Sequence, residues 1–256
     1  MADSSTLKGL NRFGRTLRQD SWWTEIVPTL IVFSAFLIYA TFRAFQGKFY
    51  QTWDLGIPYL SPFYSPLIDP EHHWWPLSPA LLILGGPAGF RATCYYYRKA
   101  YYRAFVFDPP ACAVSEKPGR GYSGETAFPL ILQNVHRYFF YIATIFVCFL
   151  WVDAVKAFRF PNGFGIGVGS IIMLVNVILL TTYSGSCHSL RHLIGGKLDC
   201  FSCAASGPVR YTGWKWVTKL NEHHMFWAWM SLFSVALTDL YICLVSAGII
   251  RDIRLL

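Results

Sequence analysis

Charged residues are scarce in this 256-residue sequence, at 14% of the chain. A soluble domain of ordinary composition carries about 25%. The sequence also lacks internal repeats, low-complexity tracts, a phosphate-binding loop and a dinucleotide-binding fingerprint, which argues against repeat proteins and the common nucleotide-binding folds. What it has instead is 54% hydrophobic and 18% aromatic residues, a composition that favours a protein surrounded by lipid.

Five segments are long and apolar enough to cross a bilayer, which takes about 20 residues of helix. The second segment is the weakest, because Pro87 removes a helix hydrogen bond within it. The sequence therefore predicts an all-α integral membrane protein: a cytoplasmic segment over residues 1–25 and a five-helix transmembrane domain over 26–256. The expected spans run from about Ile26 to Phe45, Leu77 to Tyr97, Leu130 to Val155, Gly165 to Cys187 and Met225 to Ile249.

The distribution of Lys and Arg predicts the orientation of this bundle. With the N-terminus in the cytoplasm, the inner segments hold fourteen Lys and Arg and the outer segments hold five. The first 25 residues are polar and basic, so we expect no cleavable signal peptide. The predicted location is the inner (plasma) membrane, with several passes. Topology and anionic lipid then explain the net charge of +8, without nucleic acid.

Histidine and cysteine gather at the predicted cytoplasmic ends of the helices, with five of the seven residues of each type. Structural disulfides are not expected in the reducing cytoplasm, so metal or redox chemistry is the better interpretation. The densest stretch pairs His188 and His192, four residues apart on one helix face, with the C-x-x-C of Cys200 and Cys203. That local set would suit zinc or a Rieske-type [2Fe–2S] cluster.

A second ligand set uses four helix ends at one depth of the membrane. Cys94 and Cys187 end the second and fourth predicted spans, and His136 and His224 open the third and fifth. Two Cys and two His are the ligands that a Rieske-type cluster requires. Haem b is the alternative cofactor, held by two of the inner histidines, for example His136 with His188 or His224. Cys112 has no assigned role.

Several long motifs resemble one protein family. They are Thr93–Arg103 (TCYYYRKAYYR), Leu132–Tyr138 (LQNVHRY), Cys187–His192 (CHSLRH) followed by Gly195-Gly196, and Leu220–Met225 (LNEHHM) followed by Trp227-Ala228-Trp229. Together they resemble the single-chain, cytochrome b-type membrane anchor of a succinate dehydrogenase or fumarate reductase, respiratory complex II. The similarity extends over about residues 26–254.

The resemblance implies electron transfer to membrane quinone, with a flavoprotein subunit and an iron–sulfur subunit as partners; a higher oligomer stays open. It is strongest to the five-helix class that carries a Rieske-type [2Fe–2S] cluster where other classes hold haem. Only four ligands can bind such a cluster, so at least two of six candidates must have other roles. The six are Cys94, His136, Cys187, His188, His192 and His224.

Quinone reduction also requires hydrogen-bond donors near the last redox centre. We expect them at the inner boundary, from Ser21, Trp22, Trp23, Arg137 and Tyr138. Asp239, deep in the fifth span, is a candidate for a proton path, paired with a Tyr or with Lys156. A transporter is a less favoured alternative, because it would need more polar residues at mid-membrane.

Overall fold

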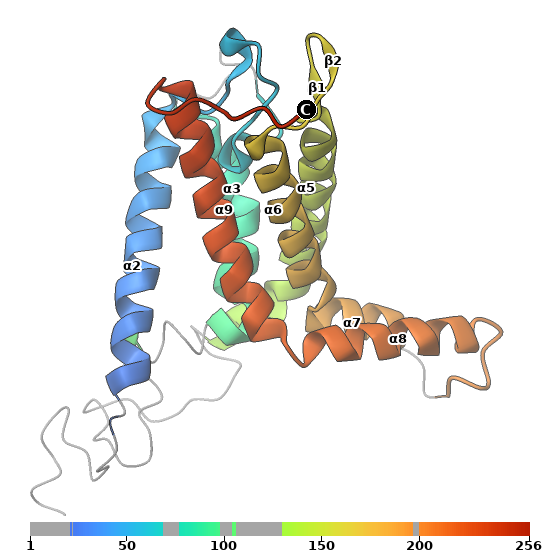
Figure 1. Cartoon of the computed structure of the whole chain (residues 1–256). Helices are drawn as coiled ribbons and strands as arrows, with labels where there is room; N and C mark the ends of the chain where they lie inside the picture. The colour runs from blue at the N-terminus through green and yellow to red at the C-terminus, as the bar shows by residue number, and fades with distance from the viewer. Residues whose placement is uncertain (1–20, 22, 69–76, 98–103, 106–129, 197–199) are drawn as a thin grey trace, which may run out of the picture.

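The protein is a bundle of apolar helices (Figure 1), seen in a computed structural model that describes residues 21, 23–68, 77–97, 104–105, 130–196 and 200–256. Within these ranges, four helices are long and apolar enough to cross a membrane. Their bounds agree with the predicted spans to within three residues, except that the helix ending at Lys156 begins six residues after the predicted Leu130. These helices are α2 (Trp23–Gln46), α5 (His136–Lys156), α6 (Val168–Gly185) and α9 (His224–Ser246).

The remaining apolar helix, α3 (Ala80–Thr93), is shorter than the predicted Leu77–Tyr97. At about 1.5 Å per residue it covers about 21 Å, less than a hydrocarbon core of about 30 Å. Pro87 is accommodated inside α3. The helix ends because Cys94 takes an extended conformation, with φ −67° and ψ 132°. This break turns Cys94 out of the helical path, and it decides where the thiol lies.

Small residues let α3 pack closely on α5. A Cβ added at Gly89 would collide with the ring of Phe139, and one added at Gly86 would lie 2.6 Å from Cγ2 of Ile142. Neither position has room for a larger side chain. In lipid, where apolar burial does not drive association, such close contact supplies the attraction between helices.

A cap covers one end of the bundle. Its described part contains η1 (Trp53–Leu55) and η2 (Pro62–Tyr64), and the hairpin of β1 (Arg159–Phe160) and β2 (Gly163–Phe164) lies at the same end. Within the glycine run 163–169, Tyr59 of the cap packs close to the backbone, and a Cβ added at Gly169 would collide with its ring.

At the opposite end, two helices that the hydropathy pattern does not predict extend sideways from the bundle (Figure 1). They are α7 (His188–Gly195) and α8 (Gly207–Asn221), and η4 (Leu130–Val135) leads into α5. Arg210 Nε donates to the carbonyl of Ile194 at 2.7 Å, and the guanidinium of Arg191 lies 4.7 Å from the ring centre of Trp214. These contacts join α7 and α8 into a hairpin.

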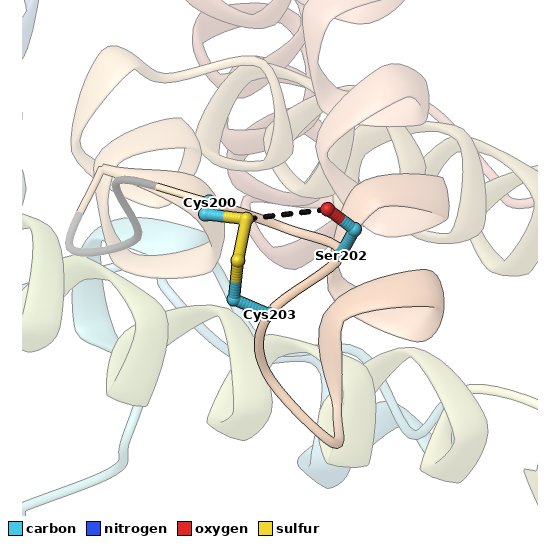
Figure 2. Close-up of a disulfide and its surroundings, with 3 residues drawn as sticks. All are labelled: Cys200, Ser202 and Cys203. Atoms are coloured by element: carbon cyan, nitrogen blue, oxygen red, sulfur yellow. Dashed lines mark hydrogen bonds between the residues drawn. A yellow bond between two sulfur atoms is a disulfide. The ribbon is translucent and has the colours of Figure 1, made fainter.

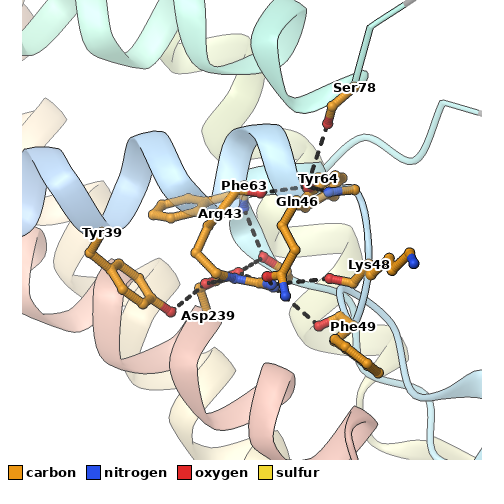
Figure 3. Close-up of polar contacts among 11 residues, drawn as sticks. Tyr39, Arg43, Gln46, Lys48, Phe49, Phe63, Tyr64, Ser78 and Asp239 are labelled. Carbon is orange, nitrogen blue, oxygen red and sulfur yellow. Dashed lines mark hydrogen bonds and ion pairs between the residues drawn. The ribbon is translucent and has the colours of Figure 1, made fainter.

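Near the capped end, α2 and α9 are joined by a buried ion pair (Figure 3). Arg43 donates through Nε to Asp239 at 2.7 Å and through Nη2 to its other oxygen at 3.2 Å. Tyr39 donates to the same carboxylate at 2.5 Å, and Ser61 of the cap donates a further hydrogen bond. Asp239 is 0% exposed. The expected pairing of Asp239 with a Tyr is confirmed, but Lys156 lies instead near Asp153, at 4.0 Å.

Arg43 also fixes the start of the cap. Its Nη1 donates to the carbonyl of Lys48 at 3.0 Å and its Nη2 to that of Phe49 at 3.1 Å, while Tyr64 donates to the carbonyl of Arg43 at 2.7 Å. The cationic group is thus surrounded by acceptors from α9 and from the start of the cap. Such complete satisfaction is what makes a charge tolerable inside a membrane protein.

Replacing Asp239 with Asn should strongly destabilise the protein, because it leaves a buried guanidinium without its counter-charge. We expect a loss of about 3–5 kcal/mol, measured as a lower midpoint of thermal unfolding in detergent by circular dichroism. The matched control is Tyr39→Phe, which removes one hydrogen bond, keeps the ion pair and should cost at most about 1.7 kcal/mol. Equal midpoints for the two variants would contradict a dominant role for the ion pair.

Candidate metal centre

Two cysteine–histidine contacts lie at the end of the bundle that carries α7 and α8. Cys94 Sγ lies 3.5 Å from Nε2 of His224, and Cys187 Sγ lies 3.2 Å from Nε2 of His136. The four residues come from four places in the sequence. Both cysteines stand at helix ends with extended backbones, Cys94 after α3 and Cys187 before α7. Both histidines are the first residues of their helices, α5 and α9. The predicted cross-helix set is therefore brought together in two pairs.

Each histidine ring is oriented by a hydroxyl group on its other nitrogen. Thr93 Oγ1 lies 2.8 Å from Nδ1 of His136, and Ser186 Oγ lies 2.6 Å from Nδ1 of His224. Thr93 and Ser186 directly precede the two cysteines in the sequence. Partners of this kind fix the direction of a ligating imidazole. Here they leave Nε2 of each ring directed toward a thiol.

Aromatic side chains pack around the two rings. Phe90 stacks on His136 with ring centres 4.7 Å apart, and Tyr183 stacks on His224 with centres 5.1 Å apart. Arg91 lies beside this cluster, its guanidinium 4.8 Å from the centre of the Tyr183 ring. It donates to the carbonyl of Ala228 at 3.1 Å and to Ser231 Oγ at 3.0 Å. A fixed positive charge therefore stands close to the Cys94 thiol.

A cavity of about 420 Å³ contains the two pairs. His224 and both cysteines are buried, and His136 is partly buried. His188 and His192 belong to the same cavity but are exposed on α7, and within the described part of the chain no hydrogen bond involves their rings. All six predicted ligands thus line one cavity, together with Arg137. Only four of them form the paired arrangement.

The local ligand set is not assembled, because Cys200 and Cys203 form a disulfide with each other (Figure 2). Neither cysteine lines the cavity. The expectation that this face carries no disulfide is therefore wrong for this pair. The C-x-x-C spacing brings two sulfurs together in the loop between α7 and α8, but it does not direct them toward His188 and His192. Cys112 lies outside the described residues.

The predicted quinone-binding residues are only partly placed by the structure. Ser21 is exposed, and its carbonyl accepts hydrogen bonds from Thr24 at the start of α2. Trp22 lies outside the described residues, and the side chain of Trp23 does too. Tyr138 is 60% exposed on α5, with the guanidinium of Arg137 5.9 Å from its ring centre. Of this set, Arg137 alone is among the residues described around the cavity.

The donor atoms suit a metal group of mixed sulfur and nitrogen ligation, although the described residues hold no group of three or more His, Cys, Asp or Glu close enough for a metal ion. The side chains form two neighbouring pairs, and a group with two metal atoms would accept ligands from both. Burial raises the pKa of the Cys187 thiol to about 11. A ligating thiolate therefore needs positive charge beside it, which a metal centre provides.

Fold and site together define a multi-pass α-helical membrane protein with a buried thiol–imidazole site at one end of its bundle. The family model described as actinobacterial succinate dehydrogenase subunit SdhC matches residues 24–248, so the chain belongs to this family. It is a membrane subunit of a succinate:quinone oxidoreductase. The membership expected from the motifs is confirmed, while the five-helix class and the Rieske-type cluster stay predictions.

A solved structure agrees with this assignment. The chain is 46% identical to a chain of the "Mycobacterium smegmatis Sdh1 complex in the apo form", with a TM-score of 0.82 and 96% of each chain covered. No curated protein matches the sequence. The Sdh1 complex indicates that other subunits of such a complex are partners of this chain.

Serine substitutions should separate the two predicted ligand sets. A metal group held by the cross-helix set would be kept in the double variant Cys200→Ser/Cys203→Ser, because the disulfide lies outside the cavity, and would be lost in Cys94→Ser. Elemental analysis of the purified complex measures the metal content relative to the unsubstituted complex, since metal held by other subunits is the same in each variant. Metal loss in the double variant, with full retention in Cys94→Ser, would reverse the assignment.

Proposed function

We propose that this chain completes the electron path of succinate dehydrogenase from the iron–sulfur subunit to membrane quinone. The group that it would hold is a Rieske-type [2Fe–2S] cluster, bound by Cys94, His136, Cys187 and His224. When bound, such a cluster supplies one-electron transfer. The observation that carries the proposal is the pair of Sγ–Nε2 contacts, at 3.5 Å and 3.2 Å, inside one cavity.

The same contacts favour a cluster over haem b. A haem iron ligated by His136 or His224 would have to bind Nε2. In the structure a thiol occupies the space beside each Nε2. A porphyrin could enter only if both thiols moved away, and Cys187 is held by a hydrogen bond from the backbone N–H of Ser189 at 3.4 Å. A transporter is disfavoured as well, because the buried charges Arg43 and Asp239 neutralise each other near one end of the bundle.

Three neighbouring side chains would tune the site. Thr93 and Ser186 hold Nδ1 of the two histidines, which keeps both Nε2 atoms available as ligands. Arg91 places a positive charge near the Cys94 thiol, fixed by hydrogen bonds to Ala228 and Ser231. That charge stabilises added negative charge, and so it favours the reduced state of a redox group beside it.

Quinone would bind at the mouth of the cavity. Arg137 lines the cavity and is exposed, so its guanidinium can donate to a quinone carbonyl. His192 lies on the same rim and is a second donor candidate. Ser21, Trp22, Trp23 and Tyr138 remain predicted contributors from the same end of the bundle. Each quinone takes up two electrons and two protons, and exposed groups at the rim can deliver those protons from water.

In the proposed orientation this end of the bundle faces the cytoplasm, with the N-terminus on the same side. The positive-inside count supports that choice. The flavoprotein and iron–sulfur subunits would then dock on the basic inner segments 98–130 and 189–221, next to the Cys94 and Cys187 pairs. Electrons entering from the iron–sulfur subunit would have a short distance to cross.

Alanine at His136 or His224 should abolish quinone reduction by the complex, because each variant removes one proposed cluster ligand. Succinate oxidation with a soluble electron acceptor should continue, since that chemistry lies on another subunit. Both activities are measured on the same membranes. The matched control is His188→Ala, which alters the same cavity outside the two pairs and should keep both the cluster and quinone reduction. Normal quinone reduction in both ligand variants would refute the relay.

The spectrum of the dithionite-reduced complex decides between cluster and haem. A Rieske-like EPR signal of low average g value, present in His188→Ala and absent in His224→Ala, supports the proposed ligands. A strong Soret band without that signal would instead assign the two histidines to haem.

Removing the hydroxyl groups tests the orientation of the histidine rings. Thr93→Val and Ser186→Ala keep all four ligands but free Nδ1 of one ring each. We expect the reduction potential of the centre to shift and metal affinity to fall by about 10–100-fold, the usual effect of losing such a partner. Redox titration followed by EPR measures the potential. An unchanged potential and metal content in both variants would contradict this role.

A further inference from the structure

Helix α8 exposes apolar side chains that the bundle does not use. Val209 is 78% exposed and Trp216 is 65% exposed. They are seven residues apart, about two helical turns, and so they lie on the same side of α8. We call these two residues the apolar stripe, on a helix of otherwise modest hydrophobicity.

A different side of α8 packs against α7. Val217 is buried there, Arg210 Nε donates to the carbonyl of Ile194 at 2.7 Å, and Thr218 accepts a hydrogen bond from Arg191 Nε at 3.1 Å. The hairpin is therefore held together without Val209 or Trp216. The apolar stripe is therefore not needed for packing within the hairpin.

The stripe is bordered by basic and aromatic residues. Lys215 and Lys219, four residues apart, share a side of α8 that lies about a quarter turn from the apolar stripe. Both are exposed, and Lys215 Nζ lies 4.8 Å from the centre of the Tyr211 ring. Trp and Tyr beside Lys are typical of helices that lie at the surface of a membrane containing anionic lipid.

The position of the hairpin agrees with that composition. Two residues separate the end of α6 at Gly185 from the start of α7, and two separate the end of α8 from the start of α9 at His224. Both ends of the hairpin are thus tied to the ends of membrane-spanning helices. The hairpin also extends sideways from the bundle (Figure 1), the direction expected of helices that lie along the surface of a bilayer.

We infer that α8 is an interfacial helix that binds anionic lipid, with the apolar stripe of Val209 and Trp216 inserted between headgroups and Lys215 and Lys219 facing the lipid phosphates. The inserted stripe would reach about 5–10 Å into the boundary between headgroups and acyl chains. This surface of the inner segment 189–221 would then contact lipid, while docking of the soluble subunits would use other residues. The inference does not depend on the identity of the bound redox group.

A polarity-sensitive fluorophore attached at Val209→Cys tests the inference in the intact complex. The complex is reconstituted into vesicles of phosphatidylcholine and phosphatidylglycerol in equal parts. The matched control carries the same fluorophore at Lys215→Cys, on the basic side of the same helix. The labelled unsubstituted complex corrects for native cysteines. Both positions are exposed, so neither substitution should disturb folding, and Trp216→Cys repeats the reading two turns further along.

We expect blue-shifted emission at position 209, quenching by lipids with a doxyl group high on the acyl chain, and quenching by iodide several-fold weaker than at position 215. Vesicles of phosphatidylcholine alone should shift the emission to the red. Equal iodide quenching at both positions would overturn the inference, because the stripe would then face water. Protection from iodide without doxyl quenching would overturn it too, since another protein of the complex would cover the stripe. Identical emission in vesicles with and without phosphatidylglycerol would overturn the preference for anionic lipid.

Discussion

The ion pair between Arg43 and Asp239 is the interaction on which the arrangement of the first helix depends. Inside a bilayer, polar groups must be satisfied by the protein itself, and helices gain little from burying apolar surface against one another. Much of α2 is exposed, with Ile31, Ile38 and Phe42 among its outward residues. Its connection to α9 therefore relies on the bidentate guanidinium–carboxylate contact. Through Ser61 and the carbonyls of Lys48 and Phe49, the same two charges also hold the cap in place.

The opposite end follows the same constraint with different chemistry. Each cysteine of the site lies where the helical hydrogen bonding stops, and each histidine lies where a helix begins. Helix ends leave backbone groups without intrahelical partners, so they belong near the membrane boundary or near polar side chains. Thr93 and Ser186 supply such polar side chains, because they are adjacent to the cysteines in the sequence and hydrogen-bond to the histidines. The site is thus a consequence of where α3, α5, α6 and α9 end.

Hydropathy was sufficient to predict four of the five expected spans, since α2, α5, α6 and α9 lie close to the expected residues, whereas α3 is shorter than its predicted span. Depth in the membrane was enough to bring Cys94, His136, Cys187 and His224 together, because helix ends at one depth are neighbours in a small bundle. The C-x-x-C spacing of Cys200 and Cys203 did not predict their disulfide, because the orientation of the two side chains depends on how α7 packs on α8. Arg91 could have been found, because an arginine inside an apolar segment is costly without a function. Thr93 and Ser186 could not, because a hydroxyl beside a cysteine carries no signal by itself.

Helix α7 connects the proposed lipid contact to the proposed redox site. His188 and His192 line the cavity, and the same helix is joined to α8 through Arg191 and Ile194. If α8 lies in the headgroup layer, α7 is held at that depth as well, and so is the rim of the cavity that it forms. A quinone moving within the membrane would then reach Arg137 and His192 without leaving the lipid, while protons could enter from the adjacent water. In this arrangement the lipid surface positions the substrate entrance, and the helix ends position the site behind it.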